Sequence, residues 1–491
     1  MSDSRNVVII GSGLGGLSTA LLLARRGFGV TVLEQSAQPG GCLQCFCRGG
    51  AKFETGMHFI GSAAEGQTLD SLLRFLGVRQ DIELQQLDTN GYEVVSLCGE
   101  LFRFANGREP FISTLAQRFP HQRLQLEQYY DLVQEVAAGS TLRSIRTTTL
   151  DLVSNAKYQL VSIDKVVESV ISDPLLQSVL VGNMPLYAAE RGRTPFATHA
   201  FITDFYNQSA FRVVGGSDSI ARSLVGSIRR QGGRVLTNCK VERIATDSEK
   251  ATGVVTARGE FIPADIIISD THPMRTLEMI DSAMIRPAFR KRINAMRQTV
   301  GCFALYLEFK PECVPYMNHN YYGYMTDTPW NCEQYAAAEW PLGFLYMHFA
   351  SSVQQQWATT GVVLTYMRMN DVMQWSNTTV GRRGHEYEDF KKLKAQKLME
   401  AVEHHFPGLH RHVLRSYTST PLTYRDYTGT EGGSMYGVAH DALNPEACRV
   451  PHRLRIPNVY QTGQNINSHG ILGTLVGSII TCSELIPDLR I

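Results

Sequence analysis

Three observations within the first sixty residues predict an α/β fold built around a parallel sheet. The run 6–10, Asn-Val-Val-Ile-Ile, has the apolar, β-branched composition of a buried parallel strand. A glycine-rich turn follows at once, and apolar residues then recur at helical spacing between 14 and 24. The run 30–33 is predicted to be a second strand and is followed by an acid, Glu34. Strand, helix and strand together form a βαβ unit, which predicts a site for a dinucleotide.

The turn reads Gly-Ser-Gly-Leu-Gly-Gly from residue 11 to residue 16. Gly11 permits the tight turn, Gly13 lets the backbone approach a pyrophosphate, and Gly16 lets the helix pack closely on the strand. The N-terminus of the helix adds free N–H groups and the positive end of its dipole. Glu34 lies 18 residues after Gly16 and can accept hydrogen bonds from a ribose. These features predict a dinucleotide but do not distinguish NAD from FAD.

The length and composition place few limits on function. A chain of 491 residues can form two or three domains with a large core. With 47 basic and 46 acidic residues the net charge is +1, so we expect no nucleic acid and no acidic partner. We see neither a secretory signal nor a run of 18 apolar residues, and we expect a cytoplasmic protein. The 10 cysteines lack framework spacing and are expected to be reduced.

A resemblance to a known family enters with the residues after Glu34. The chain continues Pro39-Gly40-Gly41-Cys42-Leu43-Gln44, and the stretch 53–61 reads Phe-Glu-Thr-Gly-Met-His-Phe-Ile-Gly. An acid, then Gly-Gly, then F-[DE]-x-G resembles flavoproteins of the amine oxidase and phytoene desaturase type. In that family the paired glycines let the backbone approach the flavin side of FAD. The resemblance therefore implies FAD, bound by a Rossmann-like domain of the glutathione reductase type.

A second part of the chain resembles the family's return to the FAD domain. Gly215-Gly216-Ser217 opens a predicted helix with Ser217 as its N-cap. The stretch 241–244, Val-Glu-Arg-Ile, resembles the segment in which the backbone of Val241 would meet the adenine. The paired glycines are not a second G-x-G-x-x-G, so no NADPH domain is evident. We expect an FAD-binding domain of residues 1–65, 213–285 and 430–491, and an interleaved α+β substrate-binding domain of residues 66–212 and 286–429.

The last part of the chain narrows the resemblance to one branch. Residues 420–423, Thr-Pro-Leu-Thr, and the later Tyr427 and Tyr436 look like the retinol saturase and carotenoid isomerase branch, as does His58 in T-G-M-H. A predicted strand runs into Gly463, and an apolar helix opens after Gly470. In the family this helix points its N-terminus at the N1–O2 edge of the flavin. Many relatives carry an acid shortly after the first of these glycines, where this chain has Gln-Asn.

The branch implies an FAD-dependent oxidoreductase that saturates, desaturates or isomerises carbon–carbon double bonds. Its substrate would be apolar, of the polyene or isoprenoid type. For a reduction, a hydride would move from flavin N5 to one alkene carbon and a proton to the other. His58 is the first candidate for the proton donor and Tyr427 or Tyr436 the second, with a packing role for His58 weighed equally. The electron donor or acceptor would be external: NADPH, a quinone or a reductase.

Several interpretations stay open at this point. A flavin amine oxidase has the same fold, and prenyl-binding escort proteins share it without catalysis, although the intact glycine fingerprint favours bound FAD. The segment 151–187 contains two apolar clusters. The second cluster, at 175–181, is predicted to be a core helix, or else the wall or lid of an apolar tunnel that touches a membrane surface. The motif of Cys42, Cys45 and Cys47 is best explained structurally, with a redox dithiol or a metal site as alternatives. Four histidines between 404 and 412 are interpreted as a solvated helix end, and we predict no metal site.

Eighteen residues from distant parts of the chain are expected to hold FAD. They are Gly11, Gly13, Leu14, Gly15, Gly16, Glu34, Gln35, Gly40, Gly41, Gln44, Met57, His58, Val241, Gly463, Gln464, Gly470, Ile471 and Leu472.

Overall fold

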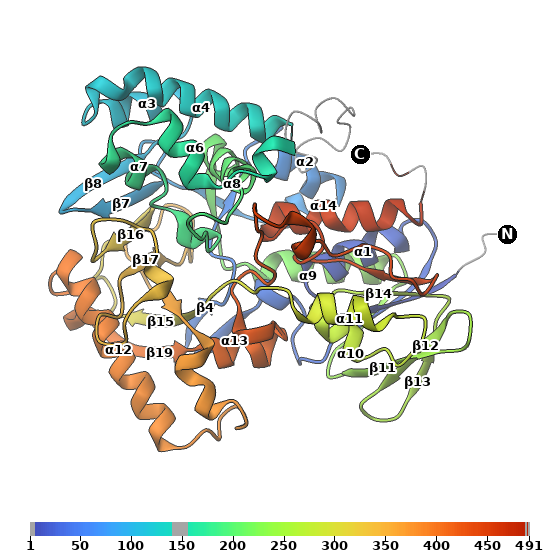
Figure 1. The fold of residues 1–491 in the computed structure, drawn as a ribbon. Helices are drawn as coiled ribbons and strands as arrows, with labels where there is room; N and C mark the ends of the chain where they lie inside the picture. Colours follow the sequence, from blue (N-terminus) through green and yellow to red (C-terminus); the bar gives the residue numbers. More distant parts are fainter. Residues whose placement is uncertain (1–4, 140–155, 487–488, 490–491) are drawn as a thin grey trace.

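A computed structural model describes residues 5–139, 156–486 and 489 of the chain (Figure 1). Its first sheet has five parallel strands in the order β10-β2-β1-β14-β20. The strands are β1 (Asn6–Ile10), β2 (Gly29–Leu33), β10 (Arg234–Leu236), β14 (Ile266–Ser269) and β20 (Val459–Gln461). The predicted βαβ unit is therefore confirmed, and strands from three distant parts of the chain extend its sheet.

Helices cover one face of this sheet and a small antiparallel sheet covers the other. Helix α1 packs against α9 and α14 (Figure 1). Alternation along β1 explains the two layers, since Ile9 joins the hydrophobic cluster on the helical side and Val8 joins a separate cluster with Val241 and Val254. The elements of these layers are α1 (Leu14–Ala24), α9 (Asp218–Arg230), α14 (Gly470–Ser483), β11 (Val241–Thr246), β12 (Ala251–Thr256), β13 (Phe261–Pro263), α10 (Pro273–Glu278) and α11 (Pro287–Asn294).

A second large sheet has seven strands in the order β19-β15-β18-β17-β16-β7-β8. Its neighbours are antiparallel except for β16 and β7, which are parallel. Figure 1 shows α3, α4, α6, α7 and α8 on one side of it and α12 on the other. The elements are β7 (Glu93–Leu97), β8 (Glu100–Phe104), β15 (Gly301–Phe309), β16 (Asn320–Tyr324), β17 (Gly343–His348), β18 (Thr360–Met367), β19 (Val413–Ser419), α3 (Arg108–Ala116), α4 (Arg123–Ala138), α6 (Ile163–Val170), α7 (Pro174–Leu180), α8 (Phe196–Gln208) and α12 (His385–His405).

Short elements connect the two large sheets. Strand β9 pairs antiparallel with β5 and β6, which ties a segment near residue 210 to segments near residues 60 and 85. These elements are β3 (Cys45–Arg48), β4 (Ala51–Glu54), β5 (Ile60–Gly61), α2 (Thr68–Phe75), β6 (Leu84–Gln86), β9 (Ala210–Val213) and α13 (Pro421–Thr428). The arrangement confirms the predicted fold class, a Rossmann-like α/β unit with an interleaved α+β unit. The residues at which one domain passes into the other stay a prediction.

One local prediction needs correction, and another is confirmed. Ser217 occupies the position before α9, but its hydroxyl donates to the carbonyl of Leu43 at 3.0 Å and does not cap the helix. In the segment 151–187, the cluster predicted as a core helix forms α7, which Asp173 caps by accepting from the N–H groups of Leu175 and Leu176. The first apolar cluster forms the separate helix α6. Residues 151–155 of that segment lie outside the described part.

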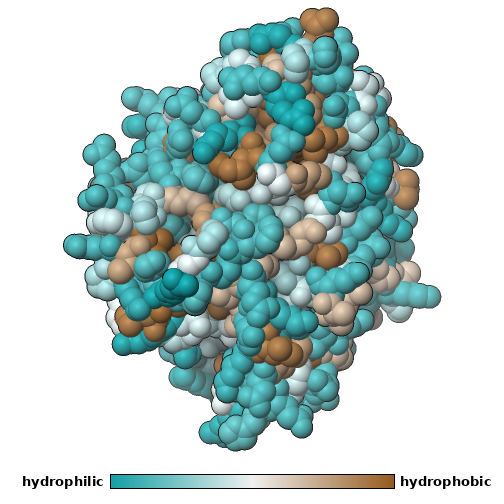
Figure 2. Space-filling view, turned by 90° about the vertical axis from the view of Figure 1, so that its left-hand side faces the viewer, coloured by the Kyte–Doolittle hydropathy of each residue, from teal (hydrophilic) through white to brown (hydrophobic). Residues whose placement is uncertain are grey.

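The described helices include none that is long and apolar enough to cross a membrane. The face drawn in Figure 2 is mostly hydrophilic, with hydrophobic residues in small separate patches. Leu124 and Leu443 are among the exposed apolar side chains of the molecule.

Buried histidines are a notable part of the core. His199 lies fully buried on α8, where Nε2 is 2.7 Å from the hydroxyl of Tyr129 and Nδ1 is 2.6 Å from that of Tyr187. Burial lowers the pKa of His199 to about 3. The pKa of His348 and that of His469 are also lowered to about 3, first by burial. All three rings are therefore neutral in the folded protein at neutral pH.

We expect this core to lose stability as the solution is acidified. Below a pH of about 6.5 the unfolded chain binds protons that the folded histidines reject, so the free energy of unfolding falls by about 1.4 kcal/mol per pH unit for each histidine. Urea unfolding followed by circular dichroism should give a clearly lower midpoint at pH 5 than at pH 7. The difference should shrink in a His199→Gln variant, and equal midpoints at the two pH values would contradict the prediction.

Candidate active site

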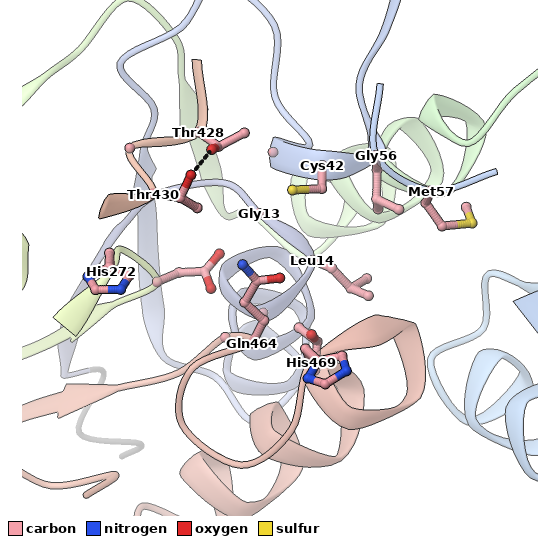
Figure 3. A pocket seen from close by; sticks show the side chains of 18 of the residues that line it. Gly13, Leu14, Cys42, Gly56, Met57, His272, Thr428, Thr430, Gln464 and His469 are labelled. Atoms are coloured by element: carbon pink, nitrogen blue, oxygen red, sulfur yellow. Dashed lines mark hydrogen bonds between the residues drawn. The ribbon is translucent and has the colours of Figure 1, made fainter. Parts of the chain in front are cut away.

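A cavity of about 860 Å³ is lined by residues from both large sheets. Figure 3 shows part of its lining, with Gly13 and Leu14 at the start of α1, Cys42, Gly56 and Met57 opposite them, and Gln464 and His469 from the turn that leads into α14. The cavity lies where the carboxyl ends of β1, β2 and β14 meet, which is the usual ligand position in an open parallel sheet.

Most residues predicted to hold the cofactor line this cavity. Gly16 is not among the lining residues, because it faces the turn behind it: a Cβ there would lie 2.3 Å from the carbonyl oxygen of Gly11. This is the close packing of helix on strand for which a glycine was expected. The predicted residues that line the cavity are Gly11, Gly13, Leu14, Gly15, Glu34, Gln35, Gly40, Gly41, Gln44, Met57, His58, Val241, Tyr427, Tyr436, Gly463, Gln464, Gly470, Ile471 and Leu472.

Three backbone segments come together at the glycines of the cavity. A Cβ on Gly15 would lie 2.7 Å from Cα of Gly463, and a Cβ on Gly41 would lie 3.1 Å from Cα of Gly13. Gly40 has a φ of 125°, which favours glycine. We call the group of Gly13, Gly15, Gly41 and Gly463 the glycine cradle.

Glu34 follows β2 and is held firmly before any ligand is bound. Its Oε2 accepts hydrogen bonds from N of Ser12 at 3.0 Å and from Oγ of Ser12 at 2.6 Å, and its Oε1 accepts one from N of Ser36 at 2.8 Å. The side chain is only 7% exposed. Because each carboxylate oxygen can accept more than one hydrogen bond, Glu34 can still accept from a ribose hydroxyl at the cavity wall.

Asp270, which the sequence analysis did not single out, faces the glycine cradle. A Cβ on Gly13 would lie 2.6 Å from its Oδ2, and one on Gly15 would lie 2.5 Å from its Oδ1. Burial, followed by the nearby Glu34 carboxylate, raises the pKa of Asp270 to about 7, against the opposing effect of the Gly16 and Gly13 amides. Its Oδ2 is buried without a hydrogen-bond partner.

One part of the cavity lining consists mainly of apolar side chains. Phe201, Ile202 and Phe205 project from α8, and Leu345 and Met347 from β17. We call this part of the lining the apolar wall; its other members are Leu186, Tyr206, Cys302, Leu364, Met435 and Tyr436. Leu186 is the contribution of the segment 151–187, whose second cluster was predicted to be either a core helix or a tunnel wall, and α8 supplies more of the surface.

His58 lies in the cavity lining beside a buried carboxylate. Its Nδ1 is 3.7 Å from Oε2 of Glu54, and neither ring nitrogen has a hydrogen-bond partner. Oε1 of Glu54 accepts from N of Ser217 at 3.0 Å, which fixes the carboxylate. The carbonyl of His58 accepts from Nη1 of the buried Arg212 at 3.2 Å. Glu54 belongs to the motif Phe-Glu-Thr-Gly, but its contact with His58 is not apparent from the sequence.

The two predicted tyrosines occupy different environments. Tyr427 is 53% exposed at the edge of the cavity. Tyr436 lies deeper, donates to the carbonyl of Pro185 at 3.3 Å, and has its ring 5.0 Å from that of His469. His469 immediately precedes α14, and neither of its ring nitrogens has a hydrogen-bond partner. It was not predicted, although its position just before Gly470 was a usable signal.

The cysteines near the cavity favour the structural interpretation. Burial raises the pKa of the Cys42 thiol to about 11 and that of Cys45 to about 12, so both stay protonated at neutral pH. Sγ of Cys45 lies 3.6 Å from Oγ of Ser217. Within the described part of the chain, all ten cysteines are free and no group of three metal-ligand residues forms.

The chain is similar to known flavoproteins along nearly its whole length. The model of the family described as flavin containing amine oxidoreductase matches residues 14–475. All-trans-retinol 13,14-reductase of Rattus norvegicus is 29% identical over 529 residues, covering 99% of this chain and 86% of the relative. Phytoene desaturase (lycopene-forming) of a Paracoccus species is 23% identical and covers 99% and 98%. Prolycopene isomerase 1, chloroplastic, of an Oncidium hybrid cultivar is 22% identical and covers 100% and 85%.

Among solved structures, wild-type putrescine oxidase bound to putrescine is similar over 98% of this chain and 99% of that one, with a TM-score of 0.66 and 15% sequence identity. At this identity the similarity shows the fold alone.

Proposed function

The chain belongs to the flavin-containing amine oxidoreductase family, and from that premise we propose that it acts on carbon–carbon double bonds of an apolar, polyene or isoprenoid-like substrate. The family implies FAD as the cofactor. A dinucleotide fits this cavity, because the glycine cradle, Glu34 and the N-termini of α1 and α14 all lie along its lining. The relatives whose names support the substrate class are a retinol 13,14-reductase, a phytoene desaturase and a prolycopene isomerase.

One observation carries the proposal: a single cavity joins the glycine cradle to the apolar wall. All eleven residues that form this wall are uncharged, and most are aliphatic or aromatic. Such a surface binds an extended hydrocarbon through the hydrophobic effect and excludes water from the reacting bond. A substrate seated there would lie directly next to the cofactor.

When bound, FAD supplies two-electron chemistry by exchanging a hydride with a carbon atom of the substrate. The chain itself must orient the substrate, exclude water and move a proton. The N-terminus of α14 directs unpaired N–H groups and a positive dipole end toward the cavity, where they stabilise negative charge. These features of the cavity support the proposal of an alkene reduction or its reverse.

We propose His58 as the residue that holds the transferred proton. Its Nδ1 lies 3.7 Å from the buried carboxylate of Glu54, which orients the ring in the cavity lining. His469 lacks such a partner, and burial together with His440 lowers its pKa to about 3, so it stays neutral. Tyr436 is the second candidate; its pKa is raised by burial, and its hydroxyl is held by Pro185. The exposed position of Tyr427 favours it least.

The electron partner is proposed to be external to the described fold. The described residues contain one parallel sheet of the dinucleotide-binding type, and we assign that sheet to FAD. NADPH, a quinone or a separate reductase would then exchange electrons with the flavin in a transient complex. We also propose a cytoplasmic location. A peripheral membrane contact would let the protein collect its lipid-like substrate.

Amine oxidation is the competing function, because a putrescine oxidase has a similar fold. Asp426 also lines the cavity, but its carboxylate is already paired with Arg383 and Arg425. A hydrocarbon substrate would contact the apolar wall more favourably than an ammonium group would.

The proposed function is tested by following flavin absorbance in the purified, FAD-loaded protein. The flavin is first reduced anaerobically with dithionite, and retinoids, carotenoids or short enones are then added one class at a time. Return of the oxidised spectrum with one unsaturated class supports a saturase. Bleaching of the oxidised protein by a more saturated polyene supports a desaturase. Bleaching by amines alone, or a protein that takes up no FAD, would overturn the proposal.

A further inference from the structure

The carboxyl group of Asp270 lies where the side chains of Gly13, Gly15 and Gly463 would be if these residues were not glycines. A Cβ on Gly463 would lie 2.3 Å from its Oδ1, and one on Gly16 would lie 3.0 Å from its Oδ2. In dinucleotide-binding folds, the absence of side chains on the glycine-rich turn lets a pyrophosphate approach the N-terminus of the helix, which is α1 here. An ionised carboxylate and a pyrophosphate cannot share this space without strong repulsion.

The groups that face Asp270 do not offer it a positive partner. Glu34, at the end of β2, adds negative charge and raises the pKa of Asp270, and Cys42 is the other titratable group that interacts with it. Lys240 and Arg275 also line the cavity, but neither forms an ion pair with Asp270. Burial and Glu34 therefore both favour the neutral acid, while only the amides of Gly16 and Gly13 favour the anion.

We propose that Asp270 binds the pyrophosphate of FAD as a neutral carboxylic acid that donates a hydrogen bond to a phosphate oxygen, so that FAD binding takes up one proton when the free site is ionised. The inference rests on the proposed use of FAD and adds a binding residue to the site. The proton comes from solvent and ends on the carboxyl oxygen of Asp270, and no other bond changes. A carboxylate that competes with the cofactor thereby becomes a donor to it.

Because the free acid has a pKa of about 7, the affinity for FAD should depend on pH in a defined way. Below that value the apparent Kd should be constant. Well above it the apparent Kd should rise about tenfold per pH unit, which gives a rise of about 50-fold between pH 7 and pH 9. His469, with its pKa near 3, and Cys42, with its pKa near 11, keep one protonation state throughout this range.

The test uses the full chain freed of flavin and titrated with FAD from pH 6 to pH 9, with quenching of flavin fluorescence as the readout. Asp270→Asn keeps the shape, provides an amide donor and cannot ionise; its Kd should vary less than about threefold over this range and be at least tenfold below that of the natural protein at pH 9. Asp281→Asn removes an equal charge at an exposed position outside the cavity and should follow the natural protein.

Calorimetry of the natural protein at pH 8 provides a second readout that needs no variant. Titrations in two buffers with different ionisation enthalpies should show close to one proton taken up per FAD. A Kd that is independent of pH, or binding without proton uptake, would overturn the role of Asp270 while leaving the use of FAD intact. Failure to bind FAD at every pH would instead overturn the proposed function.

Discussion

A Gly15→Ala variant is expected to lose its FAD, with an affinity reduced by up to about 100-fold. The added methyl group would lie 2.7 Å from Cα and 2.8 Å from N of Gly463, both backbone atoms that cannot rotate away. Overpacking of this kind costs about 1–3 kcal/mol. In this place the cost appears as lost affinity, because separating Gly15 from Gly463 opens the glycine cradle. The ratio of flavin to protein absorbance after purification, and the Kd from fluorescence titration, measure the effect.

Gly226→Ala is the matched control for this variant. Gly226 lies inside α9 with ordinary helical geometry, and its added Cβ would meet only the flexible end of Arg230 at 3.4 Å. Replacing a glycine by alanine within a helix stabilises it by roughly 0.5–1 kcal/mol, so this variant should bind FAD normally and unfold no earlier. Normal FAD content in Gly15→Ala would show that the cradle is not the cofactor site.

His58→Gln is expected to slow turnover by about 10²–10⁴-fold without changing the affinity for FAD. Glutamine keeps the size and a polar end but cannot carry a proton to carbon. The flavin of the variant should still be reduced by dithionite, and only its reoxidation by the unsaturated substrate should be slow. Glu54→Gln should give a smaller loss, since it removes the carboxylate beside the ring and leaves the ring itself.

The exposed His121 supplies the control for the histidine variant, and His121→Gln should turn over at the natural rate. A His58→Gln protein that reoxidises as fast as the natural one would exclude His58 as the proton donor. In that case Tyr436→Phe becomes the informative variant, because Tyr436 is the other predicted donor that lies deep in the cavity.

The parts of this structure that the sequence predicted well are those specified by neighbouring residues. The βαβ unit was recognised from strands rich in β-branched residues, three spaced glycines and a helix, and all of these lie between residues 6 and 34. Family resemblance then located Val241, Gly463 and the start of α14 at the same cavity, although they are far apart in the chain.

Contacts between distant segments were the parts that local patterns could not supply. Asp270 meets Gly13 only because β14 pairs with β1, a contact over more than 250 residues. Ser217 was predicted to cap α9, but its hydroxyl donates a hydrogen bond to the carbonyl of Leu43, which is distant in the sequence. His469 preceded a recognised glycine, yet nothing local indicated that a ring there would be buried without a hydrogen-bond partner.

The packing of α1 against α14 has a consequence for the synthesis of this protein. All 11 residues of α1 are buried, and the carbonyl of Gly15 accepts a hydrogen bond from Ser478, which lies 463 residues further along the chain. At about 5–20 residues per second, a ribosome needs roughly 20–90 s to make the second helix after the first. During that time a mostly apolar helix, buried in the folded protein, is not yet covered by α14, and the glycine cradle lacks Gly463. Flavin capture is therefore one of the last steps in making the protein, and the growing chain needs protection from aggregation until then.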